Sequence, residues 1–118
     1  MNKIDKPTEY GGIDISINAI SNVVGEAVTS SYGVAGIVNK NYKYGDPILD
    51  KDLYKNGIRV ICDKKKAIYD VDIHILIVYP SKVTEVISEV QKKVKYVLEE
   101  TFSLKFNSVN IFVEGLKS

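Results

Sequence analysis

Residues 68–98 read IYDVDIHILIVYPSKVTEVISEVQKKVKYVL, and this stretch decides the fold. In its first part apolar side chains take every second position, with polar ones between them: Val71, Ile73, Ile75, Ile77 and Tyr79 against Asp70, Asp72 and His74. Because successive side chains of a strand point to opposite faces, the alternation predicts a strand over 68–79 with one face in the core.

The second part of the stretch predicts a long amphipathic helix that begins after Pro80. The Ser81 hydroxyl can cap its first turn. The apolar positions recur at helical spacing and are Val83, Val86, Ile87, Val90, Val94, Val97 and Leu98. The other side of the helix is polar and carries Glu85, Glu89, Gln91, Lys92, Lys93 and Lys95. A strand followed at once by such a helix predicts a sheet with a helix packed on one face.

Weaker patterns on both sides complete the domain. Residues 58–62 predict a strand that pairs antiparallel with 68–79 across a loop at 63–67, and residues 108–115 predict a last strand. Apolar positions at helical spacing predict a helix over 16–31, capped by Ser16 and ended by the glycine turn at 32–36.

A short strand is expected at 11–15, before the first helix. The fold class is therefore α+β: a small mixed sheet with two amphipathic helices on one face, in the order β-α-β-β-α-β. Residues 1–9 are expected to be a flexible leader, and residues 10–118 a single domain. Residues 37–57 show neither period and predict an irregular surface segment, with a short strand near Val38 or a helical turn near 49–54 as alternatives.

Composition excludes several classes of protein. The chain has 118 residues, one cysteine and a net charge of +1, so it can form no internal disulfide and has no global field to attract a nucleic acid. No apolar run follows the charged N-terminus, so no signal peptide is expected. No apolar stretch approaches the roughly 20 residues that span a bilayer. These features predict a cytoplasmic protein.

Catalytic chemistry has few candidates in this chain. A hydrolase triad or a zinc site needs several converging ligands, whereas His74 and Cys62 are the only residues of their types. Asp70 and Asp72 share a strand face, the geometry of a cation site or an acid–base pair, but solvation of a polar face explains them as well. We therefore expect no enzyme activity, no catalytic residues, no cofactor and no metal.

Three features allow a binding function. The Gly33–Gly36 segment fits the GxxG loop of a KH-like RNA-binding domain, although a helix-ending turn also explains both glycines. The lysines at 64–66 could meet phosphates but also suit a solvated hairpin tip. On the sheet face away from the helices, an apolar patch of four residues is a candidate interaction surface, unless the 37–57 segment covers it. These four residues are Ile61, Leu76, Val78 and Phe112.

Five segments together resemble a known protein family. They are GGIDIS at 11–16, YGVAG at 32–36, VDIHI at 71–75, VQKKVKY at 90–96 and VNIFVEG at 109–115. Their order and spacing, from about Tyr10 to Leu116, resemble the alkaline shock protein, or envelope stress response, family of Gram-positive bacteria, and most closely its YloU-like and Gls-type members. Where that family usually has a Tyr-Gly turn before the long helix, this chain has Tyr79-Pro80-Ser81, and proline suits a helix entry.

The resemblance implies small, non-enzymatic cytosolic proteins, some held at the membrane by a separate anchor protein and some prone to self-association, with a role in cell-envelope homeostasis. The family supplies no active-site residues to carry over. The expected function is a self-associating scaffold or adaptor. Its expected partners are further copies of the chain and a membrane-anchored protein, through which any membrane association would occur.

Overall fold

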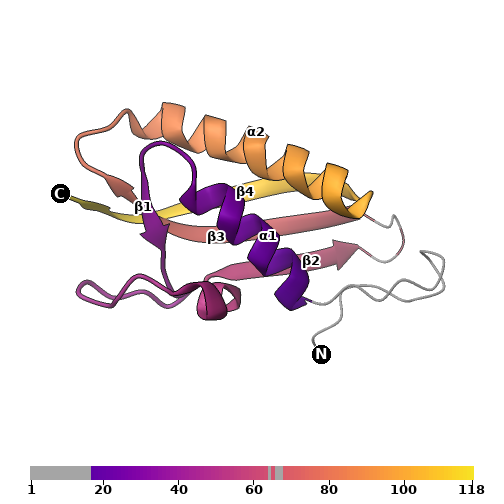
Figure 1. The fold of residues 1–118 in the computed structure, drawn as a ribbon, viewed down its shortest axis with the longest axis horizontal. Coiled ribbons are helices and arrows are strands. Elements are labelled where there is room, and N and C mark those ends of the chain that lie inside the picture. The colour runs from indigo at the N-terminus through magenta and orange to yellow at the C-terminus, as the bar shows by residue number, and fades with distance from the viewer. Residues whose placement is uncertain (1–16, 64, 66–67) are drawn as a thin grey trace.

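The computed structural model describes residues 17–63, 65 and 68–118, in which two helices pack on one side of a four-stranded sheet (Figure 1). In chain order the elements are α1 (Ile17–Thr29), β1 (Val34–Ile37), the 3-10 helix η2 (Lys51–Asn56), β2 (Ile58–Asp63), β3 (Ile68–Val78), α2 (Val83–Phe102) and β4 (Lys105–Lys117). The predicted fold class, α+β with a small mixed sheet and two helices, is confirmed.

Strand β3 is the centre of the sheet. β4 runs parallel to it along its whole length, while β1 and β2 are antiparallel to it. β2 pairs with residues 68–73 and β1 with residues 75–77, so these two strands lie end to end on the edge of β3 opposite β4. His74 stands at their junction, because its carbonyl accepts from the Val38 N–H at 3.0 Å and its own N–H donates to the Gly57 carbonyl at 3.0 Å.

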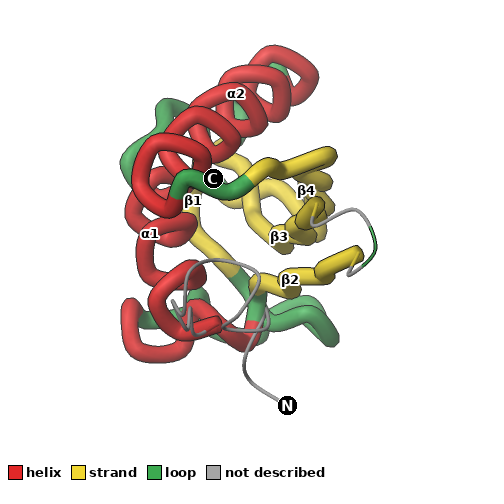
Figure 2. The backbone as a smooth tube through the Cα atoms, turned by 90° about the vertical axis from the view of Figure 1, so that its right-hand side faces the viewer, coloured by secondary structure: helices red, strands yellow, loops and turns green. Residues whose placement is uncertain are grey.

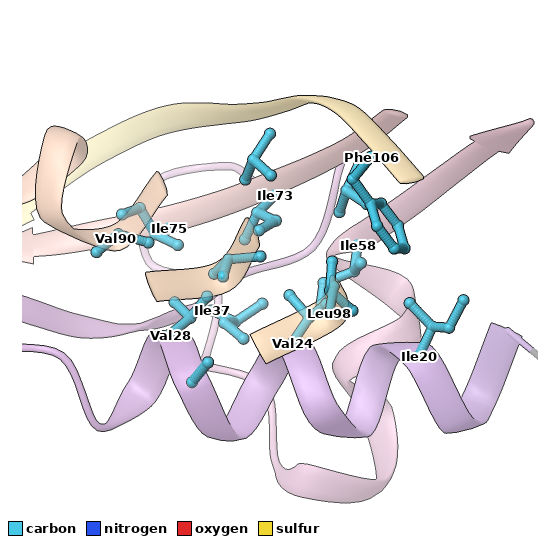
Figure 3. Close-up of a cluster of buried hydrophobic side chains, with 14 of the residues drawn as sticks. Ile20, Val24, Val28, Ile37, Ile58, Ile73, Ile75, Val90, Leu98 and Phe106 are labelled. Carbon is cyan, nitrogen blue, oxygen red and sulfur yellow. The ribbon is translucent and has the colours of Figure 1, made fainter. Parts of the chain in front are cut away.

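The core lies between the helices and one face of the sheet (Figure 3). β3 contributes alternate buried side chains, Tyr69, Val71, Ile73, Ile75 and Ile77, as its period predicts. The apolar stripes of α1 and α2 meet them with Ile20, Val24, Val28, Val86, Val90, Val94 and Leu98. Tyr79 was expected to continue the core face, but it lies beyond the end of β3 and is exposed.

Some boundaries differ from the sequence prediction. Strand β1 begins at Val34, inside the segment predicted as a helix-ending turn. Both alternatives for residues 37–57 are present, since β1 ends just before Val38 and η2 falls near the predicted helical turn. The predicted leader at 1–9, the strand at 11–15 and the Ser16 cap lie outside the described residues.

Residues 38–57 form an excursion between the two strands that share one edge of β3. The excursion is held at its base, where the Leu49 N–H donates to the Ile37 carbonyl at 2.8 Å and the Lys40 N–H donates to the Asn56 carbonyl at 3.0 Å. The Tyr54 ring, in η2, packs against Gly25 of α1. The segment without a period is thus an ordered part of the domain, positioned by contacts with distant residues.

Helix α2 begins one residue later than predicted. Its N-cap is Lys82 rather than Ser81, and no side chain there bonds to the free N–H groups of the first turn. The helix carries charged residues along one side, and no helix in the described part of the chain is long and apolar enough to cross a membrane.

The uncapped start of α2 leads to a stabilising prediction. We expect Lys82→Asp to raise the free energy of unfolding by about 1 kcal/mol, because a carboxylate at the N-cap accepts from the first-turn N–H groups and suits the positive end of the helix dipole. Thermal unfolding followed by circular dichroism measures the change. Lys82→Ala is the matched control, because it removes the same charge without adding an acceptor; equal stability of the two variants would contradict the capping argument.

Candidate interaction surface

The sheet face turned away from the helices is the candidate site. In Figure 2, which looks along the strands, both helices lie on one side of the sheet and this outer face lies on the other. The strand register places on it Arg59 and Ile61 from β2, Asp70, Asp72, His74 and Leu76 from β3, and Ser108, Asn110 and Phe112 from β4. Most of these positions are polar, so the face differs from the buried one in chemistry as well as exposure.

Two carboxylates at the middle of the outer face are bonded to β4. Asp70 Oδ1 accepts from Ser108 Oγ at 2.6 Å and from Asn107 Nδ2 at 3.2 Å. Asp72 Oδ1 accepts from Asn110 Nδ2 at 2.9 Å. Among residues 17–63, 65 and 68–118 no group of three His, Cys, Asp or Glu side chains is placed to hold a metal ion. The two carboxylates therefore cross-link β3 to β4.

His74 holds an exposed aromatic ring in place. Its Nδ1 lies 2.7 Å from Glu114 Oε2, and the Phe112 ring stacks on the imidazole with 4.9 Å between ring centroids and 16° between planes. Phe112 is still 43% exposed. A ring that is already fixed in orientation loses little entropy when a partner covers it, so Phe112 is the best-prepared apolar contact of this face.

The four residues predicted as one apolar patch are separated in the structure. Ile61, Val78 and Phe112 are 39%, 40% and 43% exposed, but Leu76 is only 6% exposed. Ile61 lies opposite Asp70, and Phe112 lies opposite His74. Along β3, the three exposed apolar residues are therefore at the levels of Asp70, His74 and Val78, and each level is about 13 Å from the next. The apolar residues are thus points on a polar face rather than a continuous patch.

The excursion explains why Leu76 is buried. Ile48 packs against Gly36, which pairs with Leu76, and so the excursion covers the outer face beside Leu76. Beside it a cleft of about 540 Å³ is lined by Tyr42, Tyr44, Pro47, Leu76 and Leu116, among others. The sequence prediction missed this cleft; the only signal was the concentration of tyrosine and proline in a segment without a period.

The other candidate residues have structural surroundings. Gly33 has a φ of +88° in the turn between α1 and β1, whereas Gly36 is buried within strand β1. The Gly33–Gly36 segment is therefore not the exposed loop that a KH-like domain lays on RNA. Cys62 is partly buried against the core. Of the lysines at 64–66 only Lys65 is described, and it is exposed.

The fold has known counterparts among solved structures. Two variants of a protein titled MamM CTD superpose with TM-scores of 0.51 at 15% sequence identity. One match covers 84% of this chain and 96% of that one, and the other covers 86% and 100%. At this identity the likeness shows a shared fold.

Sequence comparison identifies the family. YloU of Bacillus subtilis is 38% identical over 116 residues, which cover 97% of this chain and 95% of YloU. Spy1614 of Streptococcus pyogenes is 30% identical over 112 residues, covering 93% and 91%. The model of the alkaline shock protein 23 family, described by a cell envelope-related function, matches residues 5–118. The chain therefore belongs to the alkaline shock protein 23 family, as the resemblance of its five segments predicts.

Proposed function

We propose that this protein is a non-enzymatic, self-associating scaffold or adaptor in cell-envelope homeostasis, and that its outer sheet face binds a membrane-anchored partner protein from the cytoplasmic side. The observation that carries the proposal is the exposed Phe112 ring, held by His74 on the sheet face opposite the two described helices. An exposed aromatic group on a rigid strand is typical of the residues that dominate binding energy at protein interfaces.

The polar groups of the outer face suit binding better than catalysis. His74 is engaged with Glu114, and Asp70 and Asp72 accept hydrogen bonds from β4. General acid–base work needs a group free to exchange a proton with a substrate, whereas these groups hold one another in position. Fixed polar groups around a few apolar anchors instead give an interface orientation and specificity.

Phe112→Asp is expected to lower capture of the membrane partner at least tenfold, because truncation of an interface anchor typically removes about 2 kcal/mol and a carboxylate also opposes desolvation. The full chain is immobilised, and membrane proteins solubilised in mild detergent are compared between wild type and variant by quantitative mass spectrometry. A membrane-anchored protein bound by the wild type and lost with Phe112→Asp supports the proposal.

Two controls make the comparison specific. Phe112→Leu retains an apolar anchor and should keep most of the capture. Tyr96→Asp introduces the same charge at an exposed position of α2 and should leave capture unchanged. Leu76→Asp is unsuitable, since it places a charge at a buried position and would destabilise the fold. Equal capture by wild type and Phe112→Asp would refute the outer face as the binding site.

A further inference from the structure

The free edge of strand β4 is a second surface with the chemistry of an interface. Among the described residues β4 pairs only with β3, so the other edge of this 13-residue strand has no strand beside it. We propose that this edge pairs antiparallel with β4 of a second copy, centred on Ile111, to form one sheet across two subunits. This inference rests on the self-association in the proposed function and locates the contact between the two copies at the β4 edge.

The hydrogen bonds of β3 determine which β4 groups face outward. His74 directs both its N–H and its carbonyl toward Gly57 and Val38, away from β4. In a parallel ladder the residue opposite it, Phe112, must then direct its backbone groups toward β3. By alternation, the outward-facing backbone groups belong to Val109, Ile111 and Val113.

An independent contact agrees with this assignment. Gln91 of α2 donates from Nε2 to the Val109 carbonyl at 2.9 Å, as expected for a carbonyl that β3 does not use. A carbonyl oxygen can accept two hydrogen bonds, so the Val109 oxygen can still receive one from a second strand.

The length of the regular run selects the register. The β3–β4 register shifts between Tyr69 and Asp70 and again between Ile75 and Leu76, which leaves residues 108–113 of β4 regular. Antiparallel pairing about Ile111 places Val109 opposite Val113 of the second copy and Ile111 opposite its own counterpart. Each facing pair exchanges two backbone bonds, about six in all.

The side chains of the run suit a copy of themselves. Residues 108–113 read SVNIFV and contain no charge and no proline, two of the features that natural proteins use to block edge pairing. Cross-strand neighbours on the helix side would be valine with valine and isoleucine with isoleucine, which are favourable pairs. A twofold axis through Ile111 satisfies both strands at once, and this self-complementarity selects a second copy over a foreign strand.

Backbone amide exchange on the full chain tests the inference directly. Exchange is followed by NMR at two protein concentrations roughly a hundredfold apart, which brackets a wide range of Kd. We expect the N–H groups of Val109, Ile111 and Val113 to become protected at the higher concentration, while those of Asn110 and Phe112 are protected at both. Sedimentation velocity at the same concentrations should show conversion to a dimer.

A pair of variants separates the edge from the outer face. Ile111→Lys places two like charges opposite each other at the twofold axis and should weaken dimerisation at least tenfold. Ile61→Lys on β2 should leave the dimer intact. If a dimer forms but the Val109, Ile111 and Val113 amides stay unprotected, the proposal of edge pairing is overturned, while the self-association in the proposed function still holds. A monomer at every concentration would overturn both, and protection only with an added foreign peptide would overturn a second copy as the occupant.

Discussion

Gly57→Ala is expected to lower the free energy of unfolding by about 3 kcal/mol, the upper end of the usual cost of overpacking. A Cβ at this position would lie 2.2 Å from the Val38 carbonyl oxygen and 2.7 Å from Ile37 Cγ2. The carbonyl belongs to backbone already bonded to β3, so it cannot rotate away as a side chain would. Here, at the base of the excursion, the chain at Gly57 passes close to the chain at Ile37 and Val38. Only a residue without a side chain permits this close approach.

Other glycines supply controls for this effect. Gly57 has a φ of −114°, so its substitution tests close packing without left-handed strain. Gly45 has a φ of +96° with no atom within 4 Å of the added Cβ, so Gly45→Ala tests strain without packing and should cost about 1 kcal/mol.

Thermal unfolding distinguishes the two contributions. Gly57→Ala should lower Tm by roughly 10 °C, and Gly45→Ala by about a third as much. If the two variants lost equal stability, the Val38 carbonyl would be free to shift, and the close crossing at Gly57 would not be a constraint on the fold.

The sheet and helices could be predicted because their signals are local. β3 alternates strictly and α2 keeps a helical period over residues 83–98, so each element reports its own buried face. The burial of Leu76 could not be predicted in this way, because it depends on Ile48, which packs over the neighbouring Gly36 from elsewhere in the chain. The prediction that Tyr79 lies on the core face was wrong for the opposite reason. Its position continues the alternation, but β3 ends before it.

The sequence predicts on which face of the sheet the candidate residues lie, but not how they contact one another. Alternation along β3 correctly placed Asp70, Asp72 and His74 opposite the core side. The pairing of His74 with Phe112 and Glu114 depends on the register of β4, which carries two irregularities that no local pattern marks. The same register determines which backbone groups of β4 face outward, so neither the stacked ring nor the outward-facing groups of the edge could be inferred before the strands were aligned.

A second large effect is expected where the excursion packs on α1. A Cβ at Gly25 would lie 2.0 Å from Tyr54 Cδ2 and 2.4 Å from its Cε2. Alanine should gain about 1 kcal/mol over glycine within a helix. The clash with the ring outweighs this gain, so Gly25→Ala should lower the free energy of unfolding by about 2 kcal/mol in the wild-type background.

The sign of the Gly25 substitution should reverse once the ring is removed. Tyr54→Ala alone loses ring packing and should cost about 2 kcal/mol, because the ring is partly buried against the core. In that background the added methyl group meets no ring, so Gly25→Ala should stabilise by about 1 kcal/mol through helix propensity. The coupling energy from the four proteins would then be about 3 kcal/mol, measured by urea unfolding. Additive losses would show that Tyr54 does not hold η2 against α1, and that the hydrogen bonds at the base of the excursion position it alone.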